Sequence, residues 1–160
     1  MRYLRLKLDN TKFMMTHLAP HESDPLAHDH GDDYQITMPI LGTPFLELEQ
    51  KLNSLNKSNR IITIPGEKHF HFTGEEESRI LLININRHFL DQVVSSRLNK
   101  EFGGIGFKHF GEGSSEKLIK IADDLIRLNL LGNSDPVRTE ELEWELAETF
   151  LGIQKGSHSK

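Results

Sequence analysis

The sequence predicts a mainly β domain that is followed by helices. Up to about residue 88, short runs alternate apolar and polar side chains and are separated by turn residues, as in half-buried strands. Beyond that point the runs lengthen and their apolar residues recur with a helical period. A chain of 160 residues is the size of one ordinary domain. We therefore expect a β-barrel or sandwich over 1–110, with a short helix near 88–100, and a helical hairpin over 111–160.

Alternation and turn signals predict seven strands. In FLELEQ, Leu46 and Leu48 point to one face and the glutamates to the other, as in a half-solvated strand. RILLININ is apolar on both faces, so this strand is expected to be covered on both sides. The turn at residues 42–44 (Gly-Thr-Pro) predicts a hairpin between its flanking strands. The expected strands are 2–8, 11–17, 33–41, 44–50, 60–64, 68–73 and 78–87.

Three helices are expected after the strands. FLDQVVSSRLNK gives the short helix over about 88–100. The second helix begins near Ser114 or Ser115, either of which can cap it by accepting a backbone N–H bond, and stops at Gly132. Asp135 followed by Pro136 is typical of a further helix start. The short link between the last two helices predicts that they are antiparallel.

Both C-terminal helices have broader apolar faces than a single contact requires. Either one stripe packs on the β domain and the other on the partner helix, or one stripe forms a dimer seam. We favour the seam, because a helical hairpin on a small β domain has little other cover. The apolar positions are Leu118, Ile119, Ile121, Ala122, Leu125, Ile126 and Leu128 in the first helix, and Val137, Leu142, Trp144, Leu146, Ala147, Phe150, Leu151 and Ile153 in the second.

Composition and charge exclude several classes of function. The net charge is −5 and the basic residues are scattered, whereas a nucleic-acid footprint needs clustered Lys and Arg. Direct nucleic-acid contact by this chain is therefore not expected. No run of about 18 apolar residues occurs, so no membrane contact is expected, and MRYLRLKLDN lacks the apolar core of a signal peptide. The absence of cysteine removes disulfides and thiolate zinc sites. These features predict a cytoplasmic protein.

Two pairs of histidines are the candidate binding residues. His28 and His30 stand one residue apart, as do His69 and His71 in HFHF. Residues separated by one share a face of a strand, so each pair directs both imidazoles to one side. Either the imidazoles face the interior and build a polar pocket, or the phenylalanines of HFHF fill the core and the histidines face water. Taken alone, HFHF favours the second arrangement.

The spacing of these residues resembles the paired motifs of the cupin superfamily over roughly residues 20–90. That family builds a jelly-roll barrel, a double-stranded β-helix, in which three His and one Glu surround a metal. The resemblance implies that His28, His30 and His69 face inward, and it leaves His71 open. The sequence departs from the motifs, since Gln replaces Glu, the opening glycines are missing and Pro directly precedes Gly. The matching residues are His28, His30, Gln35, Gly42, Pro65, Gly66 and His69.

Two occupants suit such a pocket. Three imidazoles can anchor Zn, Ni, Fe, Mn or Cu, with Gln35 as the fourth ligand implied by the resemblance. Glutamine is neutral and binds a dication more weakly than carboxylate, which makes redox or Lewis-acid chemistry less favourable. In a metal-free pocket, His28, His30, Gln35, His69 and His71 would instead hydrogen-bond a small polar ligand such as a sugar.

The other candidate ligands have less support. Asp29, Asp32 and Asp33 could supply carboxylates, although an Asp-rich loop is more often a solvated turn. One hypothesis has His17 and His21 closing over the pocket. The histidines without ligand spacing, for which surface or loop positions are the default, are His17, His21, His88, His109 and His158.

A second resemblance, to the N-terminal domain of AraC-type transcriptional regulators, extends over nearly the whole chain. It rests on the segments YQI, LG and ITIPG around the histidines, and on INRHFLDQVV, which is similar to that family's first helix. In that family the barrel binds an effector and the helices form the dimer, while two helix-turn-helix units bind DNA. The resemblance implies effector binding and a homodimer here, and we expect the helix-turn-helix units to be lacking from this chain.

Three functions are considered. The first is a non-catalytic effector sensor, which the helices favour because a minimal enzyme does not need them. The second is a small metal-dependent cupin enzyme of the dioxygenase or isomerase type. A dimerisation module with a vestigial pocket is a third. No residue is assigned a catalytic role.

Overall fold

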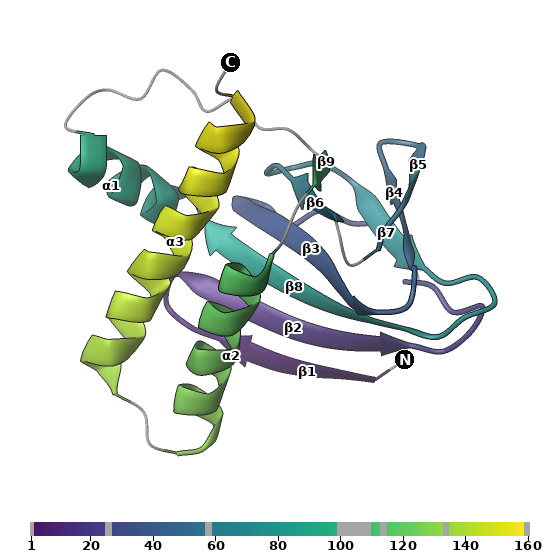
Figure 1. The fold of residues 1–160 in the computed structure, drawn as a ribbon, viewed down its shortest axis with the longest axis horizontal. Helices are drawn as coiled ribbons and strands as arrows, with labels where there is room; N and C mark the ends of the chain where they lie inside the picture. Colours follow the sequence, from purple (N-terminus) through teal and green to yellow (C-terminus); the bar gives the residue numbers. More distant parts are fainter. Residues whose placement is uncertain are drawn as a thin grey trace.

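The computed structural model describes residues 2–24, 27–56, 59–98, 110–112, 115–132 and 135–158. The helices gather beside the strands, and among the described residues no helix is long and apolar enough to cross a membrane (Figure 1). The strands are β1 (Arg2–Lys7), β2 (Thr11–Leu18), β3 (Asp33–Leu41), β4 (Phe45–Leu48), β5 (Lys51–Ser54), β6 (Asn59–Thr63), β7 (His69–Phe72), β8 (Ser78–Asn86) and β9 (Phe110–Glu112). The helices are α1 (Arg87–Leu98), α2 (Glu116–Leu130) and α3 (Pro136–His158).

The strands form two antiparallel sheets. The larger has the order β1-β2-β8-β3-β6-β9, and the smaller has the order β5-β4-β7. As predicted, β8 is covered on both faces, with Leu81 and Leu82 exposed by only 2% and 8%. In β4, Leu46 and Leu48 are buried while Glu47 is partly exposed, which confirms the expected alternation.

The hairpin predicted across residues 42–44 is wrong. β3 pairs with β6 and β8, and β4 pairs with β5 and β7, so the turn carries the chain from one sheet to the other. Gly42 has a φ of +78°, and a Cβ at this position would lie 2.3 Å from the carbonyl oxygen of Glu77. The close approach of the chain to the segment before β8 therefore requires glycine.

Two strands were not predicted. β4 turns into β5 through Glu49 and Gln50, both with positive φ, at 47° and 69°. Residues with positive φ at both turn positions give a tight hairpin that is usually built from Asn or Gly, so this sequence carried no turn signal. β9 lies between the first two predicted helices, in a glycine-rich segment for which no strand was predicted.

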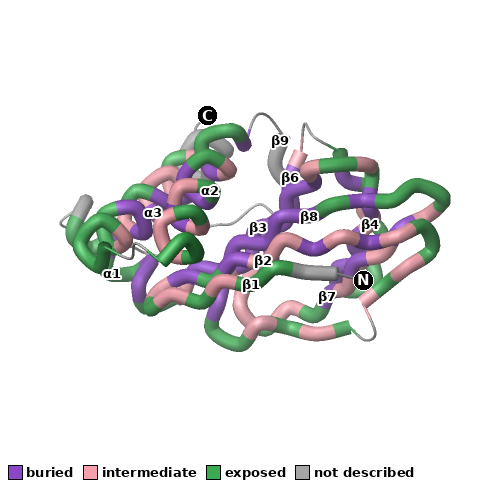
Figure 2. Tube along the Cα trace, turned by 90° about the horizontal axis from the view of Figure 1, so that it is seen from below, coloured by how far each residue is buried: buried purple, intermediate pink, exposed green. Residues whose placement is uncertain are grey.

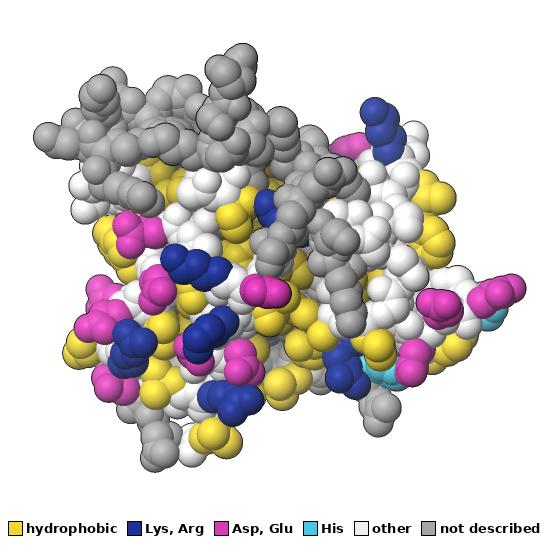
Figure 3. Space-filling model, in the orientation of Figure 1, with side chains coloured by type: hydrophobic (Ala, Val, Ile, Leu, Met, Phe, Trp, Pro, Cys, Tyr) yellow, Lys and Arg dark blue, Asp and Glu magenta, His cyan; other side chains and the backbone are white. Residues whose placement is uncertain are grey.

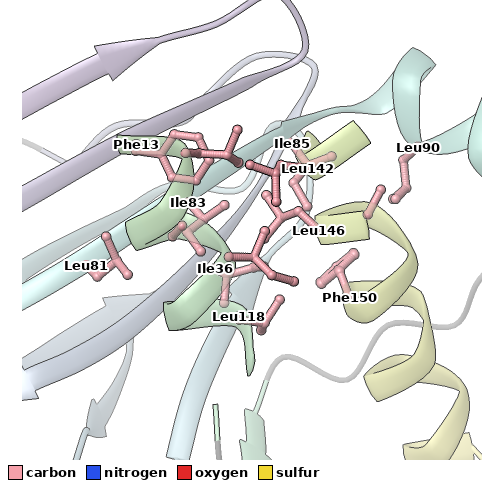
Figure 4. Packing of buried hydrophobic residues seen from close by; sticks show 14 of the residues in the cluster. Phe13, Ile36, Leu81, Ile83, Ile85, Leu90, Leu118, Leu142, Leu146 and Phe150 are labelled. Atoms are coloured by element: carbon pink, nitrogen blue, oxygen red, sulfur yellow. The ribbon is translucent and has the colours of Figure 1, made fainter. Parts of the chain in front are cut away.

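The helices cover the outer face of the larger sheet. Alternate residues of β3 and β8, such as Ile36 and Ile83, meet Leu118 of α2 and Leu146 of α3 (Figure 4). Figure 2 shows buried residues running along β3 and β8 beneath the helices. The helices and the sheet thus share one apolar core. The proposed division at residues 110/111 stays a prediction.

The helix ends follow the predictions with one exception. Asp135 Oδ1 accepts the backbone N–H of Arg138 at 3.1 Å, as expected of a cap, and Gly132, with a φ of +80°, follows α2. Ser115 occupies the N-cap position of α2 but makes no capping hydrogen bond with its side chain. Ser114 lies outside the described residues. α2 and α3 run side by side in opposite directions, which confirms the helical hairpin (Figure 1).

A candidate metal and ligand site in the β-sandwich

The inner side of the larger sheet is polar near one end. Gln35 and Thr37 of β3 alternate with the core residues and are exposed by 2% and 0%. On the opposing sheet, His69 and His71 of β7 are exposed by 1% and 2%, whereas Phe70 and Phe72 are partly exposed. HFHF therefore turns its histidines inward, and the arrangement with the phenylalanines in the core is excluded.

Three histidines form a triangle in this region. His28 and His30 come from the segment between β2 and β3, which is held against β7 because the backbones of His28 and His69 exchange two hydrogen bonds of 2.9 Å. The ring centroids are separated by 5.0 Å (His28 to His30), 4.7 Å (His28 to His69) and 5.0 Å (His30 to His69). His28 and His30 are half-buried and His69 is buried. The predicted convergence of these three side chains is thus present.

The nitrogen atoms of the triangle are spaced as metal ligands require. One ring nitrogen from each histidine lies within 4.8 Å of the others, and Nε2 of His30 is 3.2 Å from Nε2 of His69. Two nitrogens bound tetrahedrally to one zinc, at about 2.05 Å each, are about 3.3 Å apart. His69 Nδ1 donates to the carbonyl oxygen of Glu67 at 3.4 Å, which leaves its Nε2 lone pair facing the triangle. The triangle therefore fits a divalent transition metal.

Burial keeps two of these imidazoles neutral. It lowers the pKa of His30 to about 4, assisted by the neighbouring charges of His28 and His71. Burial also lowers the pKa of His69 to about 3, assisted by His71, His28 and His30. Because a metal binds the unprotonated ring, both side chains are in the ligating form at neutral pH.

Gln35 lies beside the triangle. Its Nε2 is 2.8 Å from His30 Nε2 and donates to Asn84 Oδ1 at 3.0 Å. Its Oε1 is buried and has no hydrogen-bond partner among the described residues. A buried acceptor without a partner costs about 1–3 kcal/mol. A bound cation or a ligand hydroxyl would remove this cost, so the amide suits either kind of pocket.

His71 occupies a separate, tightly held position. Its Nδ1 donates to Asp24 Oδ2 at 2.9 Å, and the same oxygen accepts the backbone N–H of His71 at 2.8 Å. Burial acts to raise the pKa of Asp24, but the hydrogen bonds and charge of His71 outweigh it and the pKa is lowered. His71 Nε2 is 3.3 Å from Thr37 Oγ1. His71 thus faces the interior beside His69, outside the triangle.

A cavity of about 320 Å³ opens next to the triangle. It is bounded by β1, β2, β3 and β8, and its polar wall is formed by His30, Gln35 and Asn84. The other lining residues are Arg5, Leu6, Lys7, Lys12, Phe13, Met14 and Leu82. A cavity of this size beside a polar cluster is the usual form of a small-molecule site.

The secondary candidates are placed elsewhere. His17 Nε2 pairs with Glu77 at 2.8 Å, and neither His17 nor His21 is among the described residues that line the cavity, so the closing hypothesis is not supported. Asp33 pairs with Lys12 at 3.4 Å, and Asp29 accepts the backbone N–H of Gly31. Asp32 and His88 are exposed. His109 and the side chain of His158 lie outside the part of the chain that the structure describes.

Two inward-facing residues were missed by the sequence reasoning. Asn84 shares a face with Ile80 and Leu82 in a strand that otherwise reads as apolar, and an amide at such a position was the available signal. Asp24 gave no comparable signal, because its contact with His71 joins residues that are distant in the sequence.

Comparison with solved structures identifies the fold. A cupin protein from Bacteroides fragilis superposes with a TM-score of 0.50 at 17% sequence identity, over 53% of this chain and 76% of that chain. A Cupin 2 conserved barrel domain protein from Salinispora arenicola gives a TM-score of 0.48 at 17% identity, over 59% of this chain and 83% of that chain. No protein-family model and no curated protein sequence matches. The β part has the cupin fold, as predicted, and C-terminal helices follow it.

Proposed function

We propose that this chain is the effector-sensing and dimerising domain of an AraC-type transcriptional regulator. A small ligand enters the cavity, where it contacts His30 and Gln35, and extends toward His28, His69 and His71, which lie beyond the cavity lining. The helical hairpin α2–α3 then changes its packing and alters the dimer. In this proposal the chain does not contact DNA itself.

The observation that carries the proposal is that the larger sheet lines the cavity with one face and packs against the helices with the other. In β3, Gln35 lines the cavity while the next residue, Ile36, is in the core shared with the helices. In β8, Asn84 likewise lines the cavity, while its neighbour Ile83 is in the core shared with the helices. A shift of these strands when a ligand binds therefore changes the surface on which α2 and α3 rest.

A buried carboxylate provides a second link. Glu143 of α3 is 2% exposed and accepts hydrogen bonds from Thr11 Oγ1 at 2.6 Å, and from the backbone N and Nδ2 of Asn10 at 3.2 Å each. Asn10 lies in the turn between β1 and β2, Thr11 is the first residue of β2, and these two strands form one wall of the cavity. Movement of this wall is therefore transmitted to α3.

A metal has a defined part in this proposal. His28, His30 and His69 would hold it, with Gln35 Oε1 as a further donor. A bound divalent ion would supply a Lewis acid that attracts an oxygen of the ligand. The chain's own groups set the orientation, since Asp24 fixes the His71 ring and Asn84 fixes the Gln35 amide. Of the metals that three imidazoles can anchor, the proposal keeps Zn, Ni, Fe and Mn.

The dimer contact is assigned to the end of the hairpin. Leu131 is 73% exposed and Val137 is 68% exposed. Val137, Trp144, Glu140 and Glu141 line a hollow on α3. An apolar protrusion beside a hollow that is apolar on one side can be self-complementary across a two-fold axis, which favours a second copy as the occupant. Figure 3 shows hydrophobic side chains among charged ones over α2 and α3.

Val137→Glu is expected to convert the dimer into monomers. Each substitution occurs twice in a two-fold contact and loses about 1.5 kcal/mol of apolar burial per side. We therefore expect the dimer Kd to rise by at least about 100-fold, as measured by sedimentation equilibrium. Leu52→Glu introduces the same charge at an exposed leucine of β5 and should leave the dimer intact. A dimer that is equally stable in both variants would place the contact elsewhere.

Ligand screening tests the sensor function. A compound that binds at the proposed site should raise the Tm of the wild type by about 5 °C or more at 100 times its Kd. It should lose most of this effect with His69→Ala, but keep it with His88→Ala, which removes an exposed histidine of α1. Hydrogen exchange in α3 should slow or quicken on binding in the wild type. Equal stabilisation of wild type and His69→Ala would contradict the pocket assignment.

A small metal-dependent cupin enzyme is the second candidate. The three-histidine triangle favours it, because neutral imidazoles around an ion are a suitable site for dioxygenase or isomerase chemistry. Chemical conversion of a compound that binds in the screen would favour the enzyme, whereas its recovery unchanged would favour the sensor.

A further inference from the structure

One row of side chains crosses the inner face of the larger sheet. The strand registers place Lys7 opposite Lys12, Lys12 opposite Asn84, and Asn84 opposite Gln35. Residues that are paired directly across antiparallel strands point to the same face. The row therefore leads from two ammonium groups on β1 and β2 to the amide that adjoins His30.

The cavity runs along this row, whose two lysines are exposed at its open side. All four residues line it, together with Arg5, which faces the same side because it is two residues from Lys7. The acidic group beside the two lysines is Asp33, whose Oδ2 lies 3.4 Å from Lys12 Nζ. Two ammonium groups against this one carboxylate leave a local positive excess along the row, although the whole chain carries a net charge of −5. Such a local excess concentrates anions at the cavity.

We infer that the ligand of this cavity is a small organic anion, with a carboxylate or phosphate group at Lys7 and Lys12 and a hydroxyl-bearing part at Asn84, Gln35 and the histidine triangle. This inference rests on the proposed function and names its class of effector. It replaces the neutral sugar suggested by the sequence.

The two lysines of the row are expected to bind an anion more tightly than a neutral ligand of the same size. Hydrogen bonds from ammonium to carboxylate or phosphate are charge-assisted and about twice as strong as those between neutral groups. A neutral sugar would occupy the same space without this gain. The cavity volume of about 320 Å³ suits a molecule of five or six carbons better than an inorganic ion alone.

Matched pairs of probes test the inference on the full chain by isothermal titration. D-gluconate is compared with D-glucose, and D-ribose 5-phosphate with D-ribose, which separates a carboxylate from a phosphate source. We expect at least one anion to bind ten times more tightly than its neutral partner. The double variant Lys7→Gln, Lys12→Gln should weaken that anion by at least tenfold. The control Lys117→Gln, Lys120→Gln removes the same charge from exposed positions of α2 and should change the affinity less than twofold.

The outcomes separate this inference from the proposed function. Tighter binding of the neutral partners, or no lysine-dependent binding of any anion, would overturn the inference. The sensor could still be correct in that case, since it depends on the helical response and not on ligand charge. Lysine-dependent anion binding without any change in the hydrogen exchange of α3 would uphold the inference and contradict the sensor. Circular dichroism of both double variants identifies any loss of folding.

Discussion

His69→Ala is expected to lower the affinity for Zn²⁺ by at least about 100-fold. Structural zinc sites bind with about 10–16 kcal/mol from four ligands, so each ligand contributes roughly 3 kcal/mol, and 1.4 kcal/mol is a factor of ten. The loss should be large because the His69 ring is buried and its Nε2 faces the triangle. Competition with a chromogenic chelator measures the affinity directly.

Two further histidine variants serve as controls for this result. His71→Ala removes a buried ring from the same face of β7, but outside the triangle, and should reduce the affinity by less than about tenfold, in keeping with a supporting contact. His17→Ala removes a histidine that pairs with Glu77 and should have no effect. If His71→Ala and His69→Ala weakened zinc equally, the triangle would not be the metal site.

Glu143→Ala is expected to destabilise the fold by about 3 kcal/mol, because it leaves the buried hydroxyl of Thr11 and the part-buried donors of Asn10 without their acceptor. Urea denaturation followed by circular dichroism measures the change in the free energy of unfolding. The variant should also weaken the proposed response of α3 to a ligand, since it removes the hydrogen bonds between the start of β2 and this helix.

Glu143→Gln separates the hydrogen bonds from the charge. An amide oxygen can still accept from Thr11 and the Asn10 backbone, so we expect a loss of only about 1 kcal/mol. Glu145→Ala, at an exposed position of the same helix, should stay within about 0.5 kcal/mol of the wild type. A Glu143→Ala protein as stable as Glu145→Ala would show that the carboxylate contributes nothing to the docking of α3.

Local patterns determined most of the elements that the sequence predicted correctly. The alternation in FLELEQ and the two apolar faces of RILLININ gave both the strands and their burial. The Asp135 cap and Gly132 gave the adjoining ends of the two C-terminal helices. The turn at Glu49 and Gln50 was missed because neither residue type usually adopts positive φ, and the pattern continued through it.

The site was predicted only where spacing along the chain carried information. The inward direction of His69 followed from a resemblance, because HFHF alone favoured the opposite face. Lys7 and Lys12 were not recognised as cavity residues, since their relation to Gln35 depends on the registers of four strands. The basic residues of the first two strands do not by themselves predict which strands pair with them.

Alternate residues of β3 and β8 face the cavity and the helices, and this alternation limits which mutations the two strands can accept. An insertion of one residue in the middle of either strand would turn Gln35 or Asn84 toward α2 and α3 and would place isoleucine in the cavity. Point substitutions at the inward positions alter only the ligand side. If the cavity binds the proposed ligand, substitutions at the inward positions can change which ligand is preferred, whereas insertions and deletions in these two strands are expected to disrupt the fold.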